Sequence, residues 1–142
     1  MSALNDIVAA MVAALAAKPA VSANIERARV RVLPETWTSA VVVRIESATL
    51  ELSALAGAPI DTDTTVVVEC YARSNTTAPD VAVDDLLAAV YARLAQNPTL
   101  NGLAADMAAT GINYDFSTDA AQHACATVTY LVRHRTGALT LE

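Results

Sequence analysis

Two long runs of β-branched residues constrain the fold of this chain more than any other feature. The first run is SAVVVRIESATLELSAL (Ser39–Leu55), and the second is TVVVECYAR (Thr65–Arg73). Branched side chains favour strands because they pack well on a pleated surface. The segment between the runs, Gly57–Thr64, contains the Gly, Pro and Asp residues that are typical of turns. The pattern predicts a long antiparallel hairpin, whose loop is longer and more acidic than a tight turn requires.

Two other segments have the periodicity of amphipathic helices. The first covers residues 3–17, with Ser2 as its N-cap and Pro19 as its stop. The second is expected to follow Asp80, taken as its N-cap, and to end at Asn97-Pro98. Their apolar stripes, spaced to share one helical face, are Leu4, Ile7, Val8, Met11, Val12 and Leu15 in the first helix and Val83, Leu86, Leu87, Val90 and Leu94 in the second.

Three further segments are predicted to be strands. Residues 24–34 (NIERARVRVLP) alternate arginines with small or branched apolar residues. Residues 112–117 (INYDFS) alternate apolar or aromatic residues with polar ones. Residues 124–136 close the chain as a third strand, and the preceding segment TLNGLAADM predicts a tight turn with a bend at Gly102. The fold class is therefore α+β, a single domain over residues 1–142 with a mostly antiparallel sheet of four to five strands and two helices packed on one face.

Charge and composition exclude some classes of partner. The net charge is -6, and the nine lysine and arginine residues are scattered along the chain, so neither nucleic-acid readout nor docking on anionic lipid is expected. The N-terminal apolar run follows Asp6 and no basic residue, and it is too short to span a bilayer, which predicts a cytoplasmic, non-membrane protein. Only 17% of residues are charged, against about 25% in ordinary soluble domains. This shortfall predicts that copies of the chain or a partner cover part of its surface.

Neither cysteine has the surroundings of a nucleophile or a metal ligand. Cys70 and Cys125 are far apart in the sequence, without a CxxC motif or a Cys/His cluster. Both lie in apolar strand-like runs, where a free thiol behaves as a small hydrophobic group. Cys70 is followed by Tyr71 and Arg73, but it shares its strand face with valines. We predict two reduced, buried thiols.

The other chemical groups also favour structural roles. Asp84 and Asp85 are adjacent on the predicted helix, so their side chains diverge by about 100° and favour the positive end of the helix dipole. His134, between two arginines, is expected to be solvated at a strand end, and His123 lies at a strand entry. The sequence predicts no catalytic residue, no cofactor and no metal site.

Three features exceed what a structural domain needs. They are the acidic loop with Asp61 and Asp63, the low charged fraction, and a basic cluster at Arg133, His134 and Arg135, with Arg73 expected nearby in the sheet. One interpretation is a mobile loop, a solvated strand end and an alanine-rich composition. The other is a ring or stack in which Asp61, Asp63, Arg73, Arg133 and Arg135 form a subunit or tail interface.

The order of these elements resembles the tail terminator family of long-tailed phages, the group of lambda minor tail protein U. The likeness is carried by the helix LNDIVAAMVAAL, the hairpin ending VVVECYARS, the segment VDDLLAAVYARLAQNPTLNGL and the closing GINYDFSTDAAQHACATVTYLVRHRT. It spans nearly the whole chain as a pattern of elements and spacing, without a single diagnostic motif.

The resemblance implies a structural protein and not an enzyme. Such proteins assemble as a hexameric ring on the finished tail tube, stop its growth and present a surface to the head connector. The implied partners are further copies of the chain, the tail tube protein and the head–tail connector protein. Because rim charges act more on association rate than on affinity, we expect monomers in dilute solution. The implied location is the virion tail, with assembly in the host cytoplasm, or a prophage-derived particle. The alternatives are another neck or tail-completion protein, and a small enzyme or ligand-binding domain with an apolar pocket.

Overall fold

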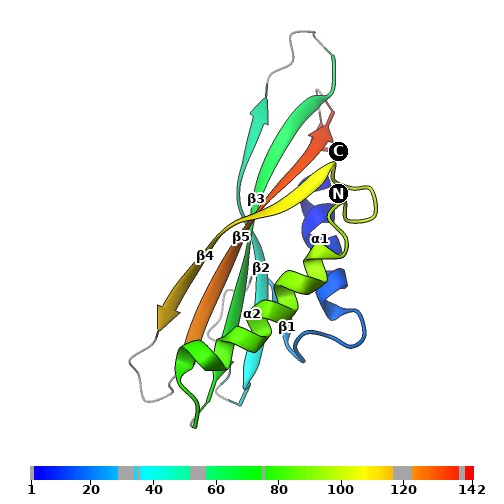
Figure 1. Cartoon of the computed structure of the whole chain (residues 1–142). Helices are drawn as coiled ribbons and strands as arrows, with labels where there is room; N and C mark the ends of the chain where they lie inside the picture. The colour runs from blue at the N-terminus through cyan, green and yellow to red at the C-terminus, as the bar shows by residue number, and fades with distance from the viewer. Residues whose placement is uncertain are drawn as a thin grey trace.

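The two β-branched runs form the centre of a five-stranded sheet in the computed structural model (Figure 1). The structure describes residues 2–28, 34, 36–51, 57–74, 76–116, 123–137 and 140–142. In chain order the elements are α1 (Ala3–Ala16), β1 (Ile25–Arg27), β2 (Ser39–Glu51), β3 (Ile60–Arg73), α2 (Pro79–Ala95), β4 (Asp106–Phe116) and β5 (His123–Thr136).

The sheet is mixed, with the strand order β1-β2-β3-β5-β4. The predicted hairpin is confirmed, since β2 and β3 pair antiparallel from Ser39 opposite Ala72 to Glu51 opposite Asp61. Strand β5 pairs antiparallel with both β3 and β4, whereas the short edge strand β1 runs parallel to β2. The prediction of an α+β fold with a mostly antiparallel sheet is therefore confirmed.

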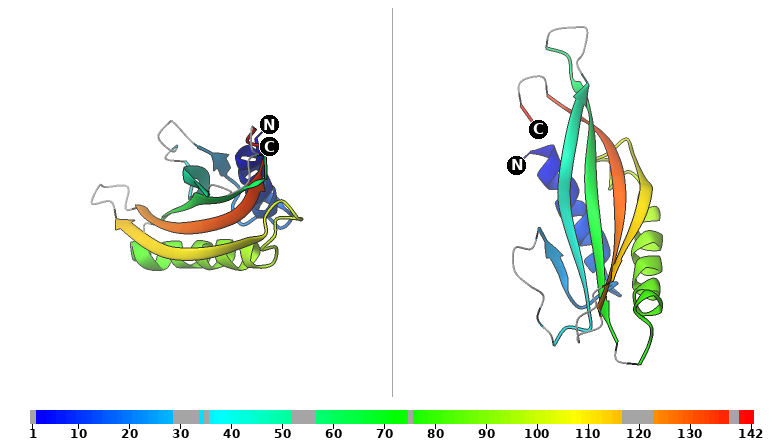
Figure 2. Two further views of the ribbon diagram at one scale, coloured as in Figure 1. Left: turned by 90° about the horizontal axis from the view of Figure 1, so that it is seen from above. Right: turned by 90° about the vertical axis from the view of Figure 1, so that its left-hand side faces the viewer.

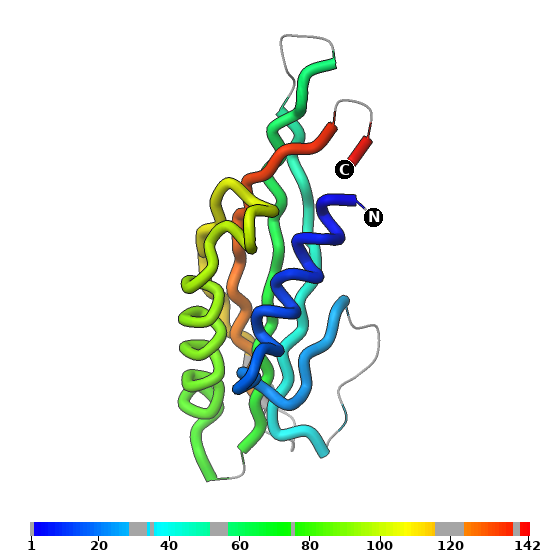
Figure 3. Tube along the Cα trace, turned by 90° about the vertical axis from the view of Figure 1, so that its right-hand side faces the viewer, coloured from blue at the N-terminus to red at the C-terminus, as the bar shows by residue number. Residues whose placement is uncertain are grey.

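Both helices pack on one face of the sheet, with α1 over β1 and β2 and α2 over β3 and β5 (Figure 3). Their predicted stripes form the helical half of the core: Ile7, Met11 and Leu15 are fully buried in α1, and all five predicted stripe residues of α2 are buried. Because strand side chains alternate between faces, every second residue of the three central strands faces this layer. The fully buried valines among them are Val41, Val43, Val66, Val68, Val128 and Val132.

The starts of two strands differ from the sequence prediction. Strand β3 begins at Ile60, so Asp61 and Asp63 lie in a strand and not in a loop, because Thr62 and Thr64 alternate with them and face inward. Strand β4 begins at Asp106, earlier than predicted. The sequence did not indicate this start, because DMAATG lacks a clear apolar alternation and its pairing with β5 shifts register between Ala109 and Gly111. Residues 52–56, which include the end of the predicted run Ser39–Leu55, lie outside the described residues, as do residues 29–33 of the strand predicted over 24–34.

The helix caps are also partly as expected. Ser2 is the N-cap of α1, where its Oγ accepts a hydrogen bond from the Asn5 N–H at 3.4 Å. The prediction for Asp80 is wrong. The N-cap is Ala78, and helix α2 starts at Pro79, two residues earlier than predicted, because proline is pre-organised for the first helical position. Asp80 therefore lies inside the first turn, where its Oδ1 accepts from the Val81 N–H.

The turn between α2 and β4 is as predicted. It bends at Gly102, whose φ of 91° lies in the region that glycine alone adopts easily. The side chain of Asn97 stabilises the turn by accepting a hydrogen bond from the Asn101 N–H.

Candidate functional site

Cys70 and Cys125 lie on neighbouring strands but on opposite faces of the sheet. Cys70 is buried, as predicted, and burial raises the pKa of its thiol to about 12. Cys125 is only half-buried, so the prediction of two buried thiols is wrong for this residue. The residue that pairs with Cys70 is Ala126, and Cys125 therefore points to the other face. A reactive thiol needs a lowered pKa, so Cys70 has the opposite of a nucleophile's surroundings.

Replacing Cys70 with serine is expected to lower the free energy of unfolding by about 1–3 kcal/mol, because a hydroxyl would lose hydration among apolar side chains. Cys125→Ser should cost less, since the Thr127 hydroxyl already lies 3.7 Å from its sulfur. Urea unfolding of both variants measures this difference. Equal losses would contradict the assignment of Cys70 to the apolar core.

The adjacent aspartates do not converge. Asp84 lines a groove on the β4 side of α2, whereas Asp85 lines a separate hollow on the side of β2 and α1. In the described part of the chain, no group of three or more His, Cys, Asp or Glu residues is arranged to hold a metal ion. The side chain of His123 lies outside the described part.

Four of the predicted interface residues form two ion pairs within the chain. Arg135 Nε lies 2.7 Å from Asp61 Oδ1, and Arg133 Nε lies 3.8 Å from Asp63 Oδ1. Each pair joins residues that are opposite one another in the β3–β5 ladder. We call these four residues the strand-end charges. Both pairs are exposed, so neither contributes much to stability.

Arg73 does not belong to this cluster. It lies at the other end of β3, opposite His123, and its Nη1 donates a hydrogen bond to the backbone oxygen of Pro34 at 3.1 Å. The distance along β3 from Asp63 to Arg73 is roughly 33 Å at about 3.3 Å per residue. The expectation that Arg73 lies near the C-terminal basic cluster is therefore wrong.

His134 is buried, contrary to the prediction of a solvated strand end. Its side chain is 4% exposed, because it faces the helix side of the sheet while Arg133 and Arg135 face the other side. The ring Nε2 and the Thr64 hydroxyl lie 2.7 Å apart and share a hydrogen bond. Burial lowers the pKa of His134, and the backbone of Arg135 and the charge of Asp63 oppose this effect. His134 continues a row of buried polar residues with Thr62, Thr64 and Thr136.

This burial predicts a specific loss of stability in mild acid. The folded state holds His134 with a lowered pKa, so its contribution is fully present above the ordinary value of about 6.5 and is lost as the pH falls through the folded pKa. The free energy of unfolding, measured by urea titration at several pH values, should fall across this range. His134→Gln removes the titrating group and should abolish this part of the pH dependence. An unchanged pH profile in that variant would contradict the prediction.

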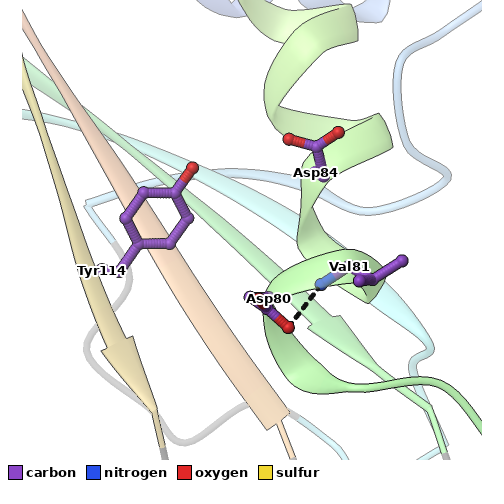
Figure 4. Close-up of a pocket in the computed structure, with 4 residues that line it drawn as sticks. All are labelled: Asp80, Val81, Asp84 and Tyr114. Carbon is purple, nitrogen blue, oxygen red and sulfur yellow. Dashed lines mark hydrogen bonds between the residues drawn. The ribbon is translucent and has the colours of Figure 1, made fainter.

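A groove that the sequence analysis missed lies between α2 and β4 (Figure 4). Its volume is about 490 Å³, and Asp80, Val81, Asp84 and Tyr114 line it. Figure 4 shows that Tyr114 on β4 and Asp84 on α2 face the same space. The alternation of Ile112 and Tyr114 was visible in the sequence, but it predicted inward-facing residues and gave no sign that α2 would leave them uncovered.

The described part of the chain contains no helix that is long and apolar enough to cross a membrane. Comparison with protein-family models gives no match, and no curated protein matches the chain.

Among solved structures, the chain is similar to the sheath/tube terminator of an extracellular contractile injection system, PVC, in its extended state. The TM-score is 0.52 and the sequence identity is 14%, over 96% of this chain. The chain spans 58% of the length of that protein. At this identity the likeness shows the fold alone. The similar protein is a sheath/tube terminator, and the comparison does not extend to the lambda group.

Proposed function

We propose that this protein is a structural tail terminator, which forms a ring on the completed tail tube, stops its elongation and provides the surface for head–tail joining. The observation that carries the proposal is the fold similarity to a sheath/tube terminator over 96% of the chain. Its partners would be further copies of itself, the tail tube protein and a connector protein, and its location the virion tail.

The surface composition supports a protein that works by association. The chain combines 54% hydrophobic residues with 17% charged residues, which is a small polar complement for a freely soluble monomer. Cys70, the residue with the most chemical promise in the sequence, is buried and has a raised pKa. These observations favour assembly over catalysis.

The strand-end charges are proposed as the tail contact. They lie where β3 and β5 project, together with the end of β2, beyond the helices (right panel of Figure 2). Because the two ion pairs are formed within the chain, a partner would meet a patterned surface of alternating charge. Charges of this kind act more on association rate and register than on affinity.

The test combines ring formation with tube length. Purified protein is examined by electron microscopy for rings, and is then added to the polymerising tail tube protein of the same genome. Capped tubes of limited length are expected, whereas unlimited growth at saturating protein would refute the proposal. Rings that join finished tails to heads without limiting tube length would instead identify a neck or tail-completion protein.

Reversing Arg133 and Arg135 to Glu should give overlong tubes while circular dichroism shows an unchanged fold. A matched control exchanges the charges in both pairs, with Asp61→Arg, Asp63→Arg, Arg133→Asp and Arg135→Asp. This control keeps the pairing within the chain but inverts the pattern that a partner meets. Tubes of normal length with the reversal variant would exclude the strand-end charges from the tail contact.

A further inference from the structure

Helix α2 leaves the helix-side face of the edge strand β4 partly uncovered. Ile112 and Tyr114 pair in the ladder with Val128 and Ala126, whose side chains are buried in the core. Both residues therefore point to the side of the sheet where the helices lie. Nevertheless Ile112 is 45% exposed and Tyr114 is 47% exposed, because α2 packs mainly on β3 and β5.

One side of α2 faces this uncovered strip. Asp80, Asp84 and Tyr91 are spaced so that they lie along the same side of the helix. Tyr91 is 49% exposed. Burial raises the pKa of the core residue Tyr130, and the nearby Tyr91 adds to this effect. The groove of Figure 4 thus has aspartates on the α2 wall and the ring of Tyr114 on the β4 wall.

Exposed apolar side chains are concentrated on these two elements. Among the described residues, four of the seven large exposed hydrophobic side chains belong to α2 and β4. These four are Val81, Tyr91, Ile112 and Tyr114. Among the described strands, β4 is the last of the sheet, so its outer edge faces no further strand of this chain. A surface with this many exposed apolar side chains is typical of a protein–protein contact.

The chemistry of the groove fits an arginine side chain. Carboxylates accept the hydrogen bonds of a guanidinium group, and aromatic rings stack on its plane. A purely acidic partner would be repelled, because Asp80 and Asp84 lie exposed at the groove. A purely apolar partner would leave these carboxylates desolvated.

The same chain carries an exposed arginine at the opposite edge of its sheet. Arg27 is the last residue of β1, it is exposed, and it donates a hydrogen bond to the neutral amide of Asn5. In the sequence Arg29 and Arg31 follow, which makes this the densest group of basic residues in the chain. In the sequence the segment from Arg27 to Arg31 is therefore rich in positive charge, whereas the groove beside β4 is lined by Asp80 and Asp84.

We propose that the groove between α2 and β4 receives Arg27, at the β1 edge, of a second copy of this chain. Because donor and acceptor surfaces lie on opposite edges, the contact is head-to-tail, and it generates a ring when the rotation closes. The inference rests on the proposed ring-forming function and assigns the subunit contact within it.

The test compares two charge reversals on the same helical turn. Asp84→Arg places a positive charge in the groove, and Asp85→Arg makes the same change on the side that faces β2 and α1. Sedimentation velocity of the full chain, up to about 1 mM, measures self-association. Asp84→Arg and Arg27→Asp should each weaken it on the order of tenfold, equivalent to about 1.4 kcal/mol. Asp85→Arg should leave it unchanged, and combining Asp84→Arg with Arg27→Asp should restore a large part of it.

Equal effects of Asp84→Arg and Asp85→Arg would overturn the inference, and so would a wild-type protein that stays monomeric at all these concentrations. Tube-length measurements on the same variants separate the two proposals. Self-association that follows the groove charges without any limit on tube growth would refute the proposed function and leave the contact in place. If Asp84→Arg leaves the capping of tubes unchanged, the proposed contact would be refuted and the proposed function would stand.

Discussion

Replacing Leu94 with alanine is expected to lower the free energy of unfolding by about 2–5 kcal/mol, one of the two largest effects expected of a single substitution in this chain. The Leu94 side chain is 1% exposed and belongs to the core cluster that joins both helices to the sheet. Its truncation would remove apolar contacts and leave a cavity that close-packed neighbours fill only in part. Chemical denaturation followed by circular dichroism measures the loss.

The control for this substitution is Leu103→Ala. Leu103 lies in the turn after α2 and is 45% exposed, so its truncation should change stability by no more than about 0.5 kcal/mol. Similar losses for the two variants would show that the last turn of α2 does not pack as the structure describes.

Replacing Arg93 with methionine is expected to lower the free energy of unfolding by about 1.5–3 kcal/mol, because hydrogen bonds from a charged donor are lost. Arg93 lies in the last turn of α2 and reaches the C-terminal end of α1. Its Nη1 donates to the backbone oxygens of Ala14 and Ala17 at 2.9 and 2.8 Å, and its Nη2 donates to that of Pro19 at 2.5 Å. Helix α1 has no basic residue in its own last turn, so Arg93 provides the positive charge that its carbonyl end favours.

Methionine keeps most of the aliphatic stem, so the loss reports on the hydrogen bonds more than on packing. Arg133→Met removes the same charge from an exposed ion pair and should cost no more than about 0.5 kcal/mol. Arg93→Lys, which can reach fewer carbonyls at once, should fall between wild type and Arg93→Met. A neutral result for Arg93→Met would show that water satisfies the end of α1 equally well.

Both substitutions concern the junction of α1 and α2, and this junction is separate from the surfaces proposed for assembly. The groove that contains Asp84 and Tyr114 lies on the β4 side of α2, whereas Arg93 holds the α1 side. Variants at the junction should therefore reduce stability before they alter the subunit contact. Variants in the groove should weaken the subunit contact before they reduce stability.

The sequence by itself determined the elements whose pattern is local. The valines of β2 and β3 specify strands through their branched side chains, and the stripe from Val83 to Leu94 specifies one face of a helix. Ser2 could be identified as a cap because its hydrogen bond reaches only to Asn5. The burial of Cys70 was also apparent, because the alternation of its strand places it on the same face as valines.

Only the tertiary structure decided the features that depend on residues distant in sequence. Asp61 and Asp63 read as loop residues, but their strand is extended by pairing with Arg135 and Arg133 of β5. His134 is buried because its strand continues to Thr136 and turns that side chain toward the helices.

The groove and the bonds of Arg93 have the same origin. They exist because α2 crosses β3 and β5 and stops short of covering β4, a placement that the periodicity of α2 cannot specify. Periodicity states which side of an element is apolar. The packing of one element on another decides which apolar residues remain exposed to meet a partner.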